Sequence, residues 1–268
     1  MAKVLSIEVG FSTTKIVEMD YQKKKPKVYR CVDTKTPEGA VRDGYLDPVK
    51  MEALKEQIRD ALKEKKIRTK RVLFTVFSTK IISREITVSA VKEHQIGAFI
   101  ESNINEYFPI ELTDYKIAHF VIQTYRDGDN AGKHRVMVMA AEKSLIQGYE
   151  QLAQMLGLYI ADIDYIGNSV IQATKLNAGS DSIMTVKIEE ENALVTILQQ
   201  GMMMMQRTVN YQVGHMDDDV LPTREEIIDI LTGTVTRLID FYAANNEENR
   251  IAQIYIIGDG SREWSITD

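Results

Sequence analysis

The residues of this sequence best suited to chemistry lie close together near its start. One apolar run ends at Gly10 and another begins at Ile16. Three hydroxyl residues and a lysine lie between them: Ser12, Thr13, Thr14 and Lys15. Hydroxyls and backbone N–H groups clustered beside a glycine are typical of a turn that binds phosphate. A hairpin with a polar, solvated turn fits the same letters, and short Gly/Ser/Thr motifs have many false positives, so both interpretations stay open.

Other kinds of chemistry find little support in the residue pattern. The sequence holds histidines without metal-ligand spacing: His94, His119, His134 and His215. No nucleophile–histidine–acid arrangement is readable, so we predict no catalytic residues and no metal site. The run Met202–Met205 could form an adaptable surface, but alternate side chains of a strand point to opposite faces, which favours core packing.

Composition narrows the class of protein. The chain has 268 residues, of which 44% are apolar, and a formal net charge of -6 with scattered basic residues, which disfavours nucleic-acid binding. A single cysteine, Cys31, excludes an intrachain disulfide and fits a reducing compartment. The N-terminus has no secretory pattern, and no window approaches the roughly 18–20 apolar residues of a membrane span. We expect a cytoplasmic protein that reaches the membrane only through partners.

The elements that must position the first turn form a β-β-β-α-β unit. Three strand-like runs open the sequence, VLSIEVG, TTKIVEMD and KVYRCVDT, with turn-like boundaries that favour a meander. Residues 49–64 have the apolar spacing of an amphipathic helix. Residues 71–78, RVLFTVFS, are expected to form a buried strand after that helix.

A different α+β pattern follows over residues 79–165. It predicts a strand at 80–88, a helix at 90–107, and two strands, YKIAHFVIQTYR and HRVMVMAA, on either side of the hydrophilic tip DGDNAGK. A helix at 143–156 and the strand YIADIDYI complete this segment, and a helix at 167–176 follows.

A second meander begins after the linker-like NAGSDS. Its strands are IMTVKIE, NALVTILQQ and MMMMQRTVN, followed by a helix at 223–243 and the closing strand of IAQIYIIGDGS. The strand-strand-strand plan therefore occurs twice, which indicates an internal duplication of topology rather than of sequence.

The duplicated meander with turns at equivalent places resembles the actin-like ATPase superfamily, whose fold is α/β with two ribonuclease H-like lobes. Several stretches are similar, in order, to the PilM family of bacterial type IV pilus machines, a relative of FtsA: LSIEVGFSTTKIVE, TPEGAVRDGYLD, TKIISREITV, NEYFPIELTDYKIAHFVI, VMVMAAEKSLIQGYEQLAQMLGL and ADIDYIGNSV. The resemblance implies a first lobe at 1–78 and 166–178, an inserted α+β (1C-like) subdomain of FtsA/PilM type at 79–165, and a shortened second lobe at 179–268.

The resemblance also implies a nucleotide site for ATP and Mg²⁺. In this superfamily the first turn holds phosphate, a role that would fall here to Gly10, Ser12, Thr13, Thr14 and Lys15. Glu8 stands where the family generally has Asp, and a longer carboxylate would shift any water-mediated contact with Mg²⁺. On the adenosine side, IYIIGDGS keeps three residues of the family pattern, Gly258, Gly260 and Ser261.

The second phosphate turn departs from the family pattern. In VKIEEENALVTILQQG, Lys187 replaces the expected Asp and Glu189 replaces the expected Gly, with Glu190 and Glu191 following. Three carboxylates would face a polyanion, and each such pair about 4 Å apart repels by ~1 kcal/mol in water and ~4 kcal/mol near a protein surface. We therefore favour a charged hairpin tip over a phosphate turn, with nucleotide binding degenerate and ATP hydrolysis absent or very slow.

Three functions follow from the resemblance. The leading one is a scaffold at the inner face of the cell membrane, which binds the N-terminal cytoplasmic peptide of a PilN-like membrane protein and meets other pilus assembly components. The peptide site would lie between the first lobe and the insert, on surfaces carried by roughly residues 79–126. The alternatives are an active nucleotide-hydrolysing member, which a carboxylate at position 187 would favour, and an FtsA-like filament former, which usually carries an amphipathic membrane helix.

Overall fold

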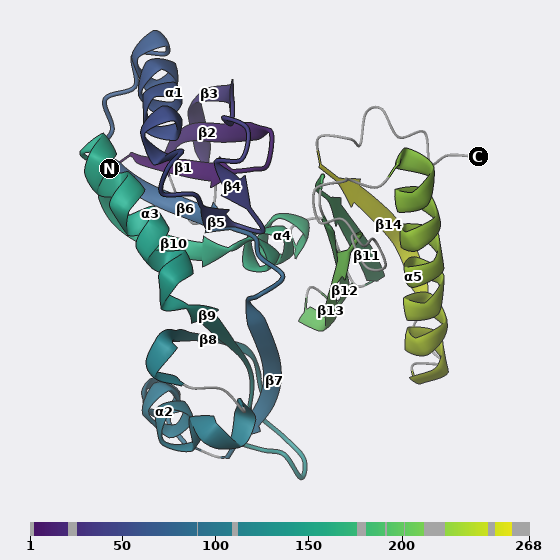
Figure 1. Ribbon diagram of the computed structural model, residues 1–268. Helices are drawn as coiled ribbons and strands as arrows, with labels where there is room; N and C mark the ends of the chain where they lie inside the picture. The colour runs from purple at the N-terminus through teal and green to yellow at the C-terminus, as the bar shows by residue number, and fades with distance from the viewer. Residues whose placement is uncertain are drawn as a thin grey trace.

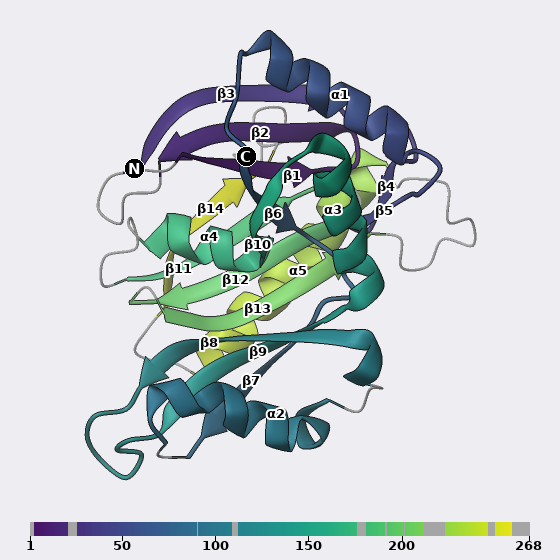
Figure 2. The same ribbon diagram turned by 90° about the vertical axis from the view of Figure 1, so that its left-hand side faces the viewer.

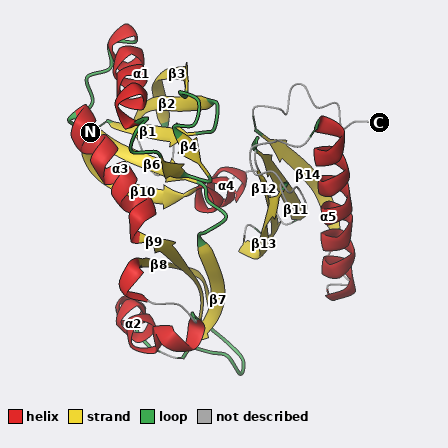
Figure 3. Ribbon diagram, viewed as in Figure 1, coloured by secondary structure: helices red, strands yellow, loops and turns green. Residues whose placement is uncertain are grey.

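The computed structural model describes residues 3–20, 26–89, 91–108, 112–175, 181–190, 192–200, 202–211, 223–245 and 250–258. These residues form three parts: a first lobe, a small module below it and a second lobe beside them (Figure 1). Each part has a β-sheet and at least one helix packed on it (Figure 3).

The first lobe is built on a five-stranded sheet in the order β10-β6-β1-β2-β3. Its strands are β1 (Val4–Val9), β2 (Thr13–Asp20), β3 (Lys27–Lys35), β6 (Arg71–Val76) and β10 (Tyr159–Tyr165). The first three pair antiparallel as the predicted meander, whereas β6 and β10 join in parallel. Every second residue of β1 and β2 is buried, so one face of the sheet belongs to a core.

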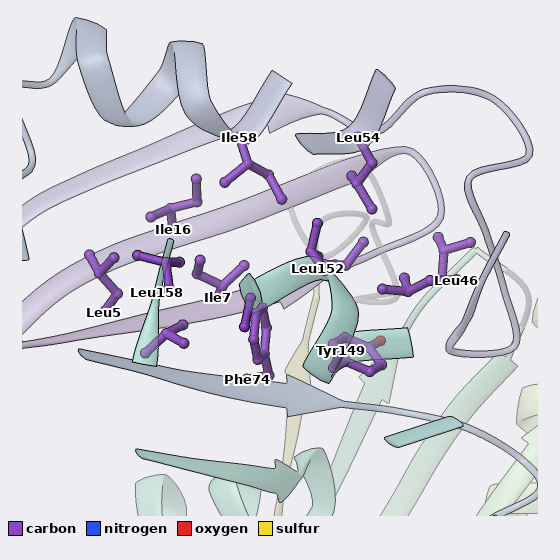
Figure 4. Close-up of a cluster of buried hydrophobic side chains, with 14 of the residues drawn as sticks. Leu5, Ile7, Ile16, Leu46, Leu54, Ile58, Phe74, Tyr149, Leu152 and Leu158 are labelled. Atoms are coloured by element: carbon purple, nitrogen blue, oxygen red, sulfur yellow. The ribbon is translucent and has the colours of Figure 1, made fainter. Parts of the chain in front are cut away.

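Two helices cover that face: α1 (Met51–Glu64) and α3 (Lys143–Leu156). Their apolar stripes pack on the strands, and Figure 4 shows the contact between sheet and helices, with Phe74 and Tyr149 at 5.3 Å between ring centroids. The short hairpin of β4 (Val41–Arg42) and β5 (Tyr45–Leu46) contributes Leu46 to the same core. The opposite face carries α4 (Ile166–Lys175), which lies between the two lobes (Figure 1).

The predicted boundary of the insert at residue 165 is wrong. β10 pairs in parallel with β6 and so completes the first sheet, and Leu145, Tyr149 and Leu152 of α3 are buried in the first core. The separate module therefore ends at β9, near residue 142. Parallel pairing needs a long crossover, and here the whole module lies within the crossover that separates β6 from α3 and β10.

The module consists of a three-stranded antiparallel sheet, β7-β9-β8, with one helix. Its elements are β7 (Ile82–Val88), η1 (Glu93–Gln95), α2 (Ile96–Tyr107), η2 (Leu112–Asp114), β8 (Tyr115–Thr124) and β9 (His134–Glu142). α2 buries Ile96, Ile100 and Ile104 against one face of the sheet. On the other face, Met137 packs against Ile183 of the second lobe in a separate cluster.

The second lobe repeats the plan of the first. Its elements are β11 (Ser182–Ile188), β12 (Asn192–Gln199), β13 (Met202–Asn210), α5 (Arg224–Asn245) and β14 (Ile251–Ile257). The sheet order β13-β12-β11-β14 corresponds strand by strand to β3-β2-β1-β6 of the first lobe. α5 covers one face and α4 with the module covers part of the other, so β11 is buried along its whole length (Figure 2). Of the helices in the described ranges, none has the length and apolar character needed to cross a bilayer.

Candidate functional site

The two β-hairpins at the starts of the lobes meet at one place. Residues of the β1–β2 hairpin, predicted to hold phosphate, contact residues of the β11–β12 hairpin directly. The duplication explains the meeting, because β1 and β11 occupy the same position in their sheets and the hairpins that follow them contact each other.

Gly10 allows the first turn to be tight. Its N–H donates to the carbonyl of Thr13 at 3.0 Å, which closes the hairpin. A Cβ at this position would lie 2.7 Å from that carbonyl oxygen, so a larger residue would have to open the turn. The Gly10 N–H group, which a phosphate would use, therefore already has an acceptor within the turn.

The hydroxyls of the turn are also engaged by the protein itself. Thr14 is fully buried, and its hydroxyl lies 2.8 Å from that of the buried Thr36, inside the first lobe. Ser12 donates its hydroxyl hydrogen bond to the carboxylate of Glu190 in the second hairpin. The hydroxyl of Thr13 lies 3.4 Å from that of Ser12.

Lys187 is the centre of the contact between the lobes. Its ammonium nitrogen lies 3.0 Å from Oε1 of Glu8, and it also pairs with the carboxylate of Glu189. The side chain of Lys187 is only 7% exposed, whereas those of Glu8 and Glu189 are 25% and 22% exposed. A charged group buried in this way requires partners, and here both partners are carboxylates of the turns.

Gly258 brings the end of β14 to the same place. Its φ of +136° and a Cβ that would lie 2.1 Å from the carbonyl oxygen of Ile188 leave room for glycine alone. The neighbouring Ile257 pairs with Lys187 in the parallel register of β11 and β14. Gly260 and Ser261, also predicted to contact nucleotide, lie outside the described residues.

A row of polar residues crosses the first sheet at the level of Glu8. In register order its members are Asp33, Lys15, Glu8, Thr75 and Asp164. Sequence reasoning identified Lys15 and Glu8 but not Thr75 or Asp164, because strands distant in sequence bring these two residues together. The sequence feature that could have identified Thr75 and Asp164 is a polar residue near the carboxyl end of each of their strands, as Glu8 is in β1.

Asp164 is the acid of this row that follows from the pairing of β10 with β6. Burial raises the pKa of its carboxyl above the usual value, although Asn168 donates hydrogen bonds to both oxygens and the Tyr165 N–H donates a third. The described residues include no group of three His, Cys, Asp or Glu side chains that could hold a metal ion.

These residues do not fit magnesium nucleotide in the arrangement described. The Gly10 N–H and the Thr14 hydroxyl are paired within the first lobe, and Glu8 accepts the ammonium of Lys187. Glu189 and Glu190 add negative charge where a polyanion would lie. What the arrangement does instead is join the two lobes by charge pairing.

A model of one protein family matches residues 6–223 of the sequence, under the description type IV pilus assembly protein PilM. The chain belongs to the PilM family. A comparison with curated proteins finds no match. The family assignment is therefore made by the model over most of the chain, and it confirms the predicted resemblance.

The fold of this PilM-family chain is similar to that of several solved structures. A chain of the PilM-PilN type IV pilus biogenesis complex superposes with a TM-score of 0.76 at 18% identity, over 97% of this chain and 82% of that chain. A Bacteroides thetaiotaomicron protein with an actin-like ATPase fold and unknown function gives 0.48 at 11% identity, over 95% and 90% of the two chains. EutJ of Carboxydothermus hydrogenoformans gives 0.46 at 8% identity, over 96% and 76%. The superposition on the chain of the PilM-PilN complex confirms the predicted actin-like fold.

Proposed function

We propose that this chain is a cytoplasmic scaffold of the type IV pilus assembly machine that binds the N-terminal cytoplasmic peptide of a PilN-like inner-membrane protein. Membership of the PilM family supports the pilus role, and the similar solved chain comes from a PilM-PilN complex. A scaffold needs a stable groove and open backbone groups rather than catalytic side chains.

The junction of the first lobe and the module offers an outer strand with an exposed apolar side chain. β7 is an outer strand of the module sheet, and Ile82 at its start is 39% exposed although the preceding Ile81 packs on the first core. Ile82, Ala140 and Ile117 are in register across the three strands, in the row nearest the first lobe. An extended peptide could add to β7 through backbone hydrogen bonds and place an apolar side chain on Ile82.

The junction is held in a fixed geometry. Asp43, in the turn between β4 and β5, accepts hydrogen bonds from the N–H and the hydroxyl of Thr79, at 2.7 and 2.6 Å. The hydroxyl of Tyr149 donates to the carbonyl of Gly44 at 2.9 Å, which ties α3 to the same turn. A rigid site loses less entropy on binding, which supports recognition of a short peptide.

The Lys187–Glu8 pair is the observation that favours a scaffold function over ATP hydrolysis. An active member would need a carboxylate at position 187 to position a metal or water, and here an ammonium lies there, paired and buried. We infer that nucleotide binding is degenerate and that the lobes are held together by this pair. A scaffold that acts through protein contacts needs no nucleotide.

Calorimetric titration tests the proposal with two ligands in parallel. A synthetic peptide copied from the cytoplasmic tail of the cognate PilN-like protein should bind with micromolar affinity, about -8 kcal/mol, and ATP with Mg²⁺ should give no saturable heat. Ile82→Glu should weaken peptide binding at least about tenfold, because a buried charge would face the apolar peptide side chain. Thr87→Glu, an exposed residue at the far end of the same strand, is the matched control. Tight ATP binding together with no peptide binding would overturn the proposal.

α2 also lies within the predicted peptide-binding segment, residues 79–126, but its apolar face does not offer a site. The apolar face of the predicted helix 90–107 is core, since Ile96, Ile100 and Ile104 are buried in the module. A charge placed on this face would unfold the module, so it would not report on peptide binding.

A further inference from the structure

The end of the first sheet opposite the β1–β2 turn is rich in cationic side chains. β1, β3, β6 and β10 all begin there, because β6 and β10 run parallel to β1 and β3 returns through β2. We use the name basic end for the cationic side chains at these strand starts and in the connection from α1 to β6: Lys3, Lys27, Arg30, Lys66, Arg68 and Arg71. The whole chain has a net charge of -6, so this concentration is local.

An open pocket of about 490 Å³ lies within the basic end. Its lining residues are Lys3, Glu18, Arg30, Lys66, Arg68 and Thr69. Glu18, whose side chain is 3% exposed, accepts hydrogen bonds from Thr69 at 2.7 Å, from Lys3 at 3.4 Å and from Arg30. Burial alone would raise the pKa of the Glu18 carboxyl, but these hydrogen bonds hold the pKa below its usual value. The ionised carboxylate therefore fixes Arg30 and Lys3 at the pocket wall.

The other two cations of the pocket have no such partner. Within the described ranges, Lys66 and Arg68 are exposed and form no ion pair. Ile67 between them is buried in the first core, and its N–H donates to the carbonyl of Leu62 at 2.8 Å. The anchored isoleucine presents both cations to the pocket, which therefore has more positive than negative charge.

Exposed apolar side chains flank these cations. Val28 and Tyr159 are 59% and 75% exposed at the starts of β3 and β10. The ammonium groups of Lys3 and Lys27 lie 4.1 and 5.2 Å from the ring centre of Tyr29. Tyrosines beside lysines and arginines are typical of surfaces that lie at the boundary between lipid headgroups and acyl chains.

We propose that the basic end binds the surface of an anionic phospholipid membrane, with a headgroup phosphate in the pocket beside Lys66 and Arg68. Charge complementarity fits any polyanion, whereas the exposed Val28, Tyr29 and Tyr159 favour lipid over nucleic acid, because such side chains can enter the boundary between headgroups and acyl chains. The inference rests on the proposed function in one respect, since a membrane-anchored partner would bring this end within reach of the bilayer.

Vesicle co-sedimentation tests the inference on the full chain. Vesicles of phosphatidylcholine alone are compared with vesicles in which about a third of the lipid is phosphatidylglycerol, at low and at physiological salt. The chain should bind only the anionic vesicles, and salt should weaken binding. Lys66→Glu with Arg68→Glu should lower the partition coefficient at least about tenfold. Lys50→Glu with Lys80→Glu makes the same charge change at exposed positions outside the basic end and should leave binding within about twofold.

A second variant keeps the net charge unchanged. Tyr29→Ala with Tyr159→Ala should weaken vesicle binding severalfold, and circular dichroism checks that all variants are folded. Equal binding to both vesicle types, no binding at low salt, or equal losses in the two charge variants would overturn the inference. So would tighter binding of a polyglutamate peptide or a DNA oligonucleotide at the same residues.

Peptide titration separates this inference from the proposed function. The Lys66→Glu, Arg68→Glu variant should bind the cytoplasmic peptide as the parent chain does. A chain that binds peptide but no vesicle refutes the lipid site alone, and one that binds vesicles but no peptide refutes the scaffold function alone.

Discussion

The ammonium of Lys187 lies 3.0 Å from the carboxylate of Glu8, across the boundary between the lobes. Each residue is the last but one of its strand, Glu8 in β1 and Lys187 in β11, and the two strands hold equivalent positions in the duplicated sheets. Two like charges at these positions would repel, whereas the observed pair attracts. The following predictions test what this contact and its surroundings do.

Replacing Lys187 should destabilise the fold. Lys187→Met removes the ammonium that pairs with the carboxylates of Glu8 and Glu189. Breaking a buried ion pair costs about 3–5 kcal/mol, with a lower figure expected here because both carboxylates are partly exposed. Urea unfolding followed by circular dichroism measures the loss. Adding Glu8→Gln to Lys187→Met should restore part of the stability, and strictly additive losses would show that the two residues do not interact.

The Thr14–Thr36 pair should be structural. Thr14→Val leaves the buried hydroxyl of Thr36 without its partner and should lower the free energy of unfolding by about 1–2 kcal/mol. Replacing both threonines by valine should recover most of that loss. ATP titration should be the same for both variants and the parent chain, since the Thr14 hydroxyl is inside the lobe, and a change confined to ATP binding would contradict the described role.

The Asp43–Thr79 clamp should control the junction. Asp43→Ala removes two hydrogen bonds and should open residues 77–83 to amide exchange, at a cost of about 2–3 kcal/mol. Thr79→Val removes only the hydroxyl bond and should cost about 1 kcal/mol. Peptide affinity should fall in the same order, because the clamp positions β7. Exchange that is unchanged in both variants would show that the junction does not depend on Asp43.

The contribution of Glu18 to the free energy of unfolding should depend on pH. Its folded pKa lies below the ordinary value of 4.5, so it contributes to the free energy of unfolding above about pH 4.5, and this contribution is lost as the pH falls through the folded pKa. The difference between the parent chain and Glu18→Gln should be largest near neutral pH and should shrink on acidification. Glu38→Gln, at an exposed position, is the control, and a difference that stays constant with pH would exclude this role for Glu18.

Local patterns in the sequence predicted most of the secondary structure. The helix expected at 143–156 has those bounds, and both three-stranded meanders form as expected, because apolar spacing and turn residues act over short distances. The repeated order of strands followed from those patterns as well. The PilM family and the actin-like fold are confirmed by the comparisons.

Relationships between distant strands were not predictable in the same way. No local feature of residues 159–165 shows that they pair with β6, so the insert was predicted to extend too far. The charged letters at the tip of the second hairpin predicted a solvated tip, and Glu190 is exposed there. They could not predict that Lys187 is buried, because its partner Glu8 is far away in sequence. Asp164 entered the polar row through the same parallel pairing.

The Lys187 ammonium is a counterion that is covalently part of the chain. A soluble cation between two carboxylates would come and go with its concentration, and the angle between the lobes would follow it. On the proposed function, a tethered charge makes that angle independent of any metabolite in the cell. A peptide bound at the junction would then be attached to a rigid body. That body could transmit a pulling force without any nucleotide cycle in this chain.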